Sequence, residues 1–139
     1  MEVKRHDYFQ FTDINLFAVL IASVFHIVLG LIWFHPKLFG NEWSKLTGKD
    51  LKPSSFWIIP GIIGHFLMSF VLVILIKLAS SNNGIGGLII GLLVWIGFIV
   101  PMEIGELVWE KIPFRLFLIR IGNQFVGMAV SGFILGVWQ

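Results

Sequence analysis

Four apolar stretches, each long enough to cross a lipid bilayer, account for most of this chain. A membrane-spanning helix needs about 20 predominantly apolar residues, because each residue adds about 1.5 Å along the helix axis. The sequence therefore predicts an all-α integral membrane four-helix bundle in a single domain, 1–139. The four predicted helices cover residues 14–35, 56–79, 85–109 and 114–138.

Composition supports a membrane protein and excludes several other classes. Hydrophobic residues make up 57% of the chain and charged residues 13%, against about 45–50% and about 25% in ordinary soluble domains. A small soluble domain cannot hide so much apolar surface, and a disordered chain does not contain it. The net charge of +2, with dispersed basic residues, excludes a nucleic-acid binder. The absence of cysteine excludes disulfides and thiolate metal sites.

Four spans place both termini on one side of the membrane, and the basic residues predict which side. The first and third connections carry six lysines and arginines, whereas the termini and the second connection carry three. Basic residues accumulate on the cytoplasmic side. We therefore predict the cell (inner) membrane as the location, with external termini and a cytoplasmic 36–55 loop.

The 36–55 loop contains a predicted short interfacial helix between the first two spans. Asn41 is its expected N-cap and Gly48 its terminator. Phe39, Trp43 and Leu46 are expected to face the acyl chains, which makes Trp33, Phe39 and Trp43 candidate interface anchors. A gate or lid over the bundle is the alternative function of this segment.

Ionisable and amide side chains inside the spans are the candidate functional residues, because such groups are costly within a membrane. When depth is counted from the helix ends, all of them fall in the cytoplasmic half of the bilayer. Helical spacing places them on the faces that carry small residues, which are the packed faces of membrane helices. The candidates are His26, His65, Glu103, Glu106, Arg120, Asn123 and Gln124.

Two interpretations fit this one-sided set. In the functional one, Arg120 binds an anion or compensates charge, Glu103 is its partner or a proton acceptor, and His26 and His65 relay protons. Asn123 and Gln124 then supply neutral hydrogen bonds. In the structural one, Arg120 pairs with glutamates or extends to the interface, and the other groups join helices by hydrogen bonds.

Metal and haem sites are weaker alternatives. Two histidines and a carboxylate (His26, His65 and Glu103) are possible ligands of zinc or iron. The two histidines, at equal depth, also suggest the axial ligands of one haem. No Glu-x-x-His pair, catalytic triad or phosphate-binding loop is present, so no catalytic residue is assigned and an enzyme is not favoured.

Two Gly-x-x-x-Gly motifs, 87–91 and 132–136, predict close contact between helices. The contact lies either within one chain or between the two copies of a homodimer.

Three stretches of the chain carry a distinctive pattern: residues 30–43, 92–101 and 113–119. The first contains the pattern Gly-x-x-Trp-Phe-x-Pro-x-x-Phe-Gly-x-x-Trp, formed here around Gly30, Trp33, Pro36, Gly40 and Trp43. Together, the three stretches resemble the small membrane proteins of the domain-of-unknown-function family 1761. The resemblance implies a four-span membrane protein and brings no established activity.

The sequence thus favours binding or transport of a small polar or ionic solute through an intramembrane pocket that faces the cytoplasm. The alternative is a structural or accessory membrane protein that binds lipid or a partner membrane protein. A haem- or metal-binding membrane protein is the third hypothesis.

Overall fold

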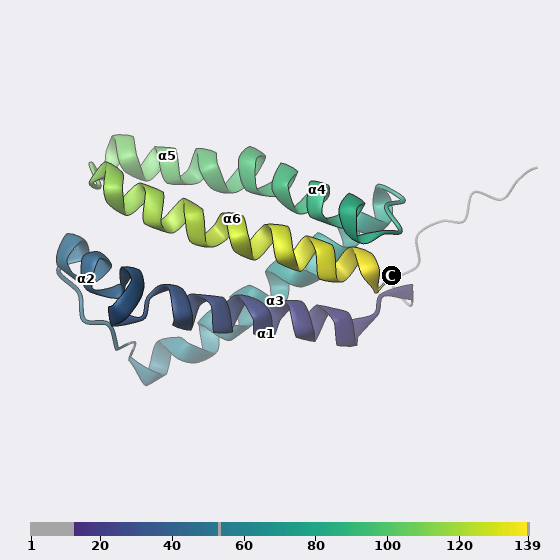
Figure 1. The fold of residues 1–139 in the computed structure, drawn as a ribbon, viewed down its shortest axis with the longest axis horizontal. Helices are drawn as coiled ribbons and strands as arrows, with labels where there is room; N and C mark the ends of the chain where they lie inside the picture. The colour runs from purple at the N-terminus through teal and green to yellow at the C-terminus, as the bar shows by residue number, and fades with distance from the viewer. Residues whose placement is uncertain (1–12, 53, 139) are drawn as a thin grey trace, which may run out of the picture.

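The computed structural model describes residues 13–52 and 54–138, and four long helices run through it in alternating directions (Figure 1). The connections 34–52 and 110–113 lie at one end of the bundle, called here the loop end. The 79–83 connection and the C-terminus lie at the other, the terminal end (Figure 1). The helices are α1 (Leu16–Trp33), α2 (Asn41–Thr47), α3 (Ser55–Leu78), α4 (Gly84–Val94), α5 (Val100–Trp109) and α6 (Phe114–Val137), with π-helical segments η2 (Pro36–Gly40) and η3 (Trp95–Ile99).

By length and composition, four helical stretches can cross a membrane: Leu16–Trp33, Ile58–Leu78, Gly84–Trp109 and Phe114–Val137. Large apolar side chains are exposed on the outer faces of all four, as lipid contact requires. The described chain is a multi-pass membrane protein, and the predicted all-α bundle with a short helix between its first two spans is confirmed.

α1 begins where Asn15 caps it and ends before Pro36. The Asn15 side chain accepts hydrogen bonds from the amides of Phe17 and Ala18, at 3.1 and 3.2 Å, which satisfies two donors of the first turn. The helix ends at Trp33, because the residue before a proline is disfavoured in the helical conformation.

A tight corner joins α1 to α2. A Cβ added at Gly40 would overlap the carbonyl oxygen of Phe34, so only glycine fits there. The predicted N-cap at Asn41 is wrong: Asn41 is already the first residue of α2, because η2 runs directly into that helix. The predicted terminator Gly48 is confirmed. It has the left-handed φ of 69° and donates its N–H to Ser44 O at 2.8 Å.

The third span is one continuous helix with a π-helical turn in the middle. Val100 N–H bonds to Trp95 O, five residues back instead of four. Pro101 follows immediately, and a proline lacks an N–H and crowds the carbonyl four residues before it. The wider turn accommodates that proline within an unbroken span.

α4 and α6 make the closest helix contact, through glycines on both sides. A Cβ at Gly87 would lie 2.8 Å from Gly136 Cα, and one at Gly132 would lie 3.0 Å from the carbonyl carbon of Gly87. The two Gly-x-x-x-Gly motifs therefore pack against each other within one chain. A homodimer would have to use another surface.

The tightest core lies among α1, α3 and α6. Val19 of α1, Val73 and Ile76 of α3, and Met128 and Leu135 of α6 are all fully buried. Toward the loop end, α3 packs less closely, and residues 58–64 are exposed on every side of the helix. Pro60 lies inside this part of α3 and does not end the helix.

Candidate functional site

Arg120 of α6 is held by two carboxylates of α5. Its Nη1 donates to Glu106 Oε2 and lies 3.3 Å from Glu103 Oε2. Glu103 and Glu106 are three residues apart and so share one face of α5. The π-helical turn η3 precedes them and sets the rotation of that face toward α6. The structure thus brings together three of the predicted residues as one ionic cluster inside the spans.

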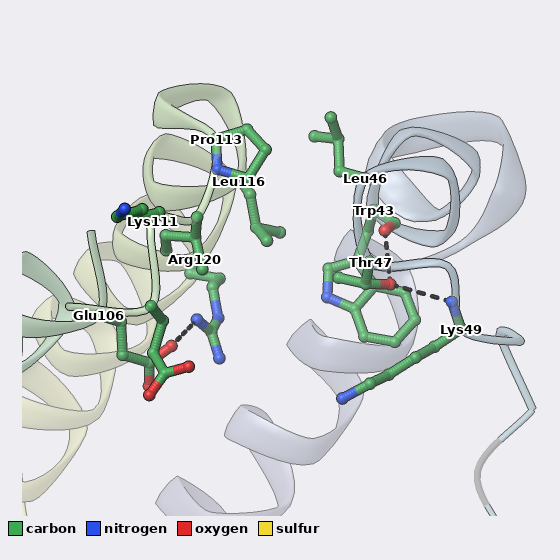
Figure 2. A pocket seen from close by; sticks show the side chains of 11 residues that line it. Trp43, Leu46, Thr47, Lys49, Glu106, Lys111, Pro113, Leu116 and Arg120 are labelled. Carbon is green, nitrogen blue, oxygen red and sulfur yellow. Dashed lines mark hydrogen bonds and ion pairs between the residues drawn. The ribbon is translucent and has the colours of Figure 1, made fainter. Parts of the chain in front are cut away.

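The ionic cluster lies at the edge of a pocket of about 540 Å³ at the loop end. The pocket separates α2 and its following residues from the corner between α5 and α6 (Figure 2). Glu106 and Arg120 line it, whereas Glu103 does not. The other lining residues are Trp43, Leu46, Thr47, Lys49, Glu110, Lys111, Ile112, Pro113 and Leu116.

α2 forms one wall of this pocket. Glu42 bridges to Arg115 of α6 at 3.0 Å, which ties α2 to the bundle. Trp43 and Leu46, which the sequence places toward the acyl chains, line the pocket (Figure 2). Trp43 also packs edge-on against Phe34, with ring centroids 5.9 Å apart. α2 is thus fixed to the bundle on the side of the pocket opposite the ionic cluster.

Two tryptophans hold the α6 backbone beside Arg120. The indole N–H of Trp33 donates to Ile119 O at 3.0 Å, and that of Trp95 donates to Ile121 O at 2.9 Å. Phe39, the third candidate anchor with Trp33 and Trp43, packs against Trp33 with ring centroids 4.8 Å apart and ring planes tilted by 34°. The sequence missed both indole bonds. The available signal was an indole N–H within an apolar span, where its hydrogen bond must go to a carbonyl or a polar side chain of the protein.

His26 and His65 form a second group deeper in the bundle. Their rings stack with centroids 5.4 Å apart and an angle of 24° between planes. His26 is 3% exposed and lies against Gly127 of α6, where a Cβ would come within 2.7 Å of its Nδ1. Asn123 is four residues before Gly127 and hence on the same face of α6. It is buried as well.

Several buried polar side-chain atoms of the bundle have no hydrogen-bond partner among the described residues. Buried polar groups almost always have hydrogen-bond partners, so these atoms are candidates for contact with water or a solute. Glu103 Oε2 belongs to this set, although it lies near Arg120, because the two atoms do not have hydrogen-bond geometry. The set is His26 Nε2, Ser69 Oγ, Glu103 Oε2, Asn123 Nδ2 and Gln124 Oε1.

The possible metal ligands His26, His65 and Glu103 are not brought together. In the parts of the chain that the structure describes, no three His, Cys, Asp or Glu side chains form a group that could hold a metal ion. The two histidine rings lie face to face as a stacked pair. Axial ligation of one haem would instead place them on opposite faces of a porphyrin.

Comparison with models of protein families identifies a family that this chain matches. The family model described as "Protein of unknown function (DUF1761)" matches residues 17–136. No curated protein and no solved structure matches this chain. The match covers the four spans except for Leu16 and Val137, and it includes every residue of the candidate site.

Proposed function

We propose that this chain, which belongs to the DUF1761 family, binds a small ionic solute in the pocket at the loop end of its bundle. The observation that carries the proposal is the position of Arg120. It lies within a membrane-spanning helix, on the wall of an open pocket, and is held by Glu103 and Glu106. Intramembrane charges are costly and mark solute or ion sites, whereas a buried ion pair adds little net stability.

The polar character continues inward from the pocket, and this supports transport as the finer proposal. Gln124, Asn123 and His26 each carry a buried atom without a partner in the described chain. Toward the terminal end, the packed core around Val19, Val73 and Leu135 contains, among the described residues, no buried polar side chains other than serines. The pocket lies at the loop end, and the apolar core closes the bundle toward the terminal end. Transport requires α1, α3 and α6 to separate at that core.

Ligand-dependent stability tests the binding proposal. The detergent-purified protein is heated with acetate, ethanolamine or β-alanine at constant ionic strength. A ligand at 100 times its Kd stabilises the folded state by about 2.7 kcal/mol, so at least one probe should raise the Tm. Leu46→Trp, which fills the pocket, and Arg120→Gln should abolish the shift, whereas Lys77→Gln at the terminal end should preserve it. No shift with any probe, or a shift that Leu46→Trp retains, would contradict the proposal.

Proton entry into vesicles tests the transport proposal separately. Proteoliposomes containing pyranine are driven by a potassium diffusion potential with valinomycin. We expect faster acidification than in empty vesicles, with Lys77→Gln matching the wild type and Glu103→Gln and His26→Ala falling to the empty-vesicle rate. A wild-type rate equal to that of empty vesicles would refute proton-coupled transport and leave the binding proposal intact.

A second candidate function, docking of a partner membrane helix, is favoured by the exposed part of α3. Gly61 and Gly64 have no neighbouring atoms within 4 Å of an added Cβ, so another helix can approach there closely. A homodimer would also use this surface. The chain has no native cysteine, so Gly61→Cys reports on it directly. A disulfide dimer with Gly61→Cys and none with Gly105→Cys supports self-association, and no adduct with either contradicts docking at this surface.

A further inference from the structure

The pocket at the loop end carries opposite charges that the chain itself does not neutralise. On one wall, the side chain of Lys49 and the indole ring of Trp43 point into the gap (Figure 2). On the other, Glu106 and Arg120 are joined to each other, and Glu110 and Lys111 also line the pocket. The lining therefore offers both donors and carboxylates to whatever enters.

Some charged residues of the pocket form ion pairs within the chain, and others do not. Arg120 is occupied by Glu106 and Glu103. Within residues 13–52 and 54–138, Lys49, Lys111 and Glu110 make no ion pair, and the Trp43 indole N–H makes no hydrogen bond. Lys49, Lys111 and Glu110 are therefore available to a ligand. Glu106 Oε1 is available as well, and Glu106 lies four residues before Glu110, on the same helical face.

A ligand with a single charge satisfies only part of this set. A lone anion would be attracted to the lysines and repelled by Glu110, and a lone cation would have the reverse problem. A ligand with both an anionic group and an ammonium group can interact favourably with the unpaired lysine and the unpaired carboxylate of the lining at the same time. Trp43 adds an aromatic face on which a cation can also rest.

We infer that the loop-end pocket binds a zwitterion, whose phosphate or carboxylate group meets Lys49, the cation that points into the gap (Figure 2), and whose ammonium group meets Glu110 and Glu106. The inference rests on the proposed binding function and names the ligand class. The volume of about 540 Å³ is within the range of about 300–1,000 Å³ for small-molecule sites. At the membrane edge, this chemistry has two sources: a soluble zwitterion and the headgroup of an ethanolamine phospholipid.

Matched soluble probes test the ligand class. Binding to the purified protein is measured by calorimetry for glycerophosphoethanolamine and β-alanine, which are zwitterions, dimethyl phosphate, an anion, and ethanolamine, a cation. A zwitterion should bind at least about tenfold more tightly than either single-charge probe, which corresponds to about 1.4 kcal/mol. Lys49→Gln and Glu110→Gln should each weaken zwitterion binding by about tenfold. The controls are Lys37→Gln, which removes a positive charge as Lys49→Gln does, and Asp50→Asn, which removes a negative charge as Glu110→Gln does. Both positions are exposed at the loop end, and both variants should leave binding unchanged.

Native mass spectrometry tests the lipid source. The protein is taken from nanodiscs of phosphatidylethanolamine or of phosphatidylglycerol. Retention of one phosphatidylethanolamine by the wild type, lost in Lys49→Gln, supports the inference with the headgroup as source. Tight binding of a soluble zwitterion without lipid retention supports it with a soluble source.

Other outcomes overturn the inference in distinguishable ways. If dimethyl phosphate or ethanolamine binds as tightly as the zwitterions, the ligand class is wrong and the binding function stands. Equal loss of binding in Lys37→Gln and Lys49→Gln would show that general surface charge, and not the pocket, attracts the probe. If no probe and no lipid binds, both the ligand class and the proposed function are wrong.

Discussion

Replacing Gly87 with alanine tests whether the glycine contact between α4 and α6 holds the bundle together. The added Cβ would lie 2.8 Å from Gly136 Cα and 3.0 Å from Gly136 N. Carbon atoms in contact normally lie about 3.5–4.0 Å apart, so the helices must separate by about 0.7–1.2 Å. Backbone atoms cannot rotate away as a side chain can. We therefore expect Gly87→Ala to lower the free energy of unfolding by about 1–3 kcal/mol, the usual cost of overpacking.

The matched control is Gly105→Ala on the same span. A Cβ at Gly105 meets no atom within 4 Å, and alanine favours a helix over glycine by about 1 kcal/mol. This variant should be as stable as the wild type or slightly more stable. Both free energies are measured by titration with SDS in mixed micelles, with circular dichroism as the signal. Equal stability of Gly87→Ala and Gly105→Ala would refute the argument that close backbone contact dominates this interface.

Four further predictions concern single positions, and the first three use the same unfolding titration. Trp33→Phe removes the indole bond to α6 and should cost about 0.5–1.5 kcal/mol, whereas Trp109→Phe, at a side chain that is 84% exposed, should cost nothing; equal losses would disprove the role of the bond. Ser69→Ala removes a buried hydroxyl without a partner in the described chain and should not destabilise the protein; a loss above about 1 kcal/mol would show that the hydroxyl holds a water or ligand. Arg120→Met leaves the carboxylates of Glu103 and Glu106 without their cation and should cost about 1–3 kcal/mol, since the cluster is only partly buried. Replacing both glutamates with glutamine in the Arg120→Met variant should recover stability, and no recovery would contradict the charge argument. Lys52→Cys in whole cells should react with an impermeant maleimide only after permeabilisation, and labelling of intact cells would reverse the predicted orientation.

The sequence predicted the spans and the polar faces well, because both depend on local spacing. Glu103 and Glu106 are three residues apart, so they share a face wherever α5 lies. A charged Arg120 inside a span needs a carboxylate partner, and α5 is the neighbouring helix in the chain. Their meeting thus followed from helix periodicity and the cost of unpaired charge in a membrane.

Features that depend on how helices are placed were not predictable in this way. Gly61, His65 and Ser69 share a helical face, yet Ser69 is buried and Gly61 is exposed, because α3 packs closely only toward the terminal end. Periodicity identifies a face and does not say whether another helix covers it. The bonds of Trp33 and Trp95 to α6 likewise join residues far apart in the chain.

The π-helical turn in the third span has a consequence for how this protein tolerates insertions and deletions. One residue of an α-helix corresponds to a rotation of about 100°. The turn at Trp95–Ile99 therefore sets the rotation of one part of this helix relative to the other. The first part carries the glycines that contact α6, and the second carries the carboxylates that hold Arg120. Loss of one residue there would keep the span long enough to cross the membrane while turning Glu103 and Glu106 away from Arg120. The third span of such a variant would keep nearly the same length and hydropathy, although the ionic cluster would no longer form.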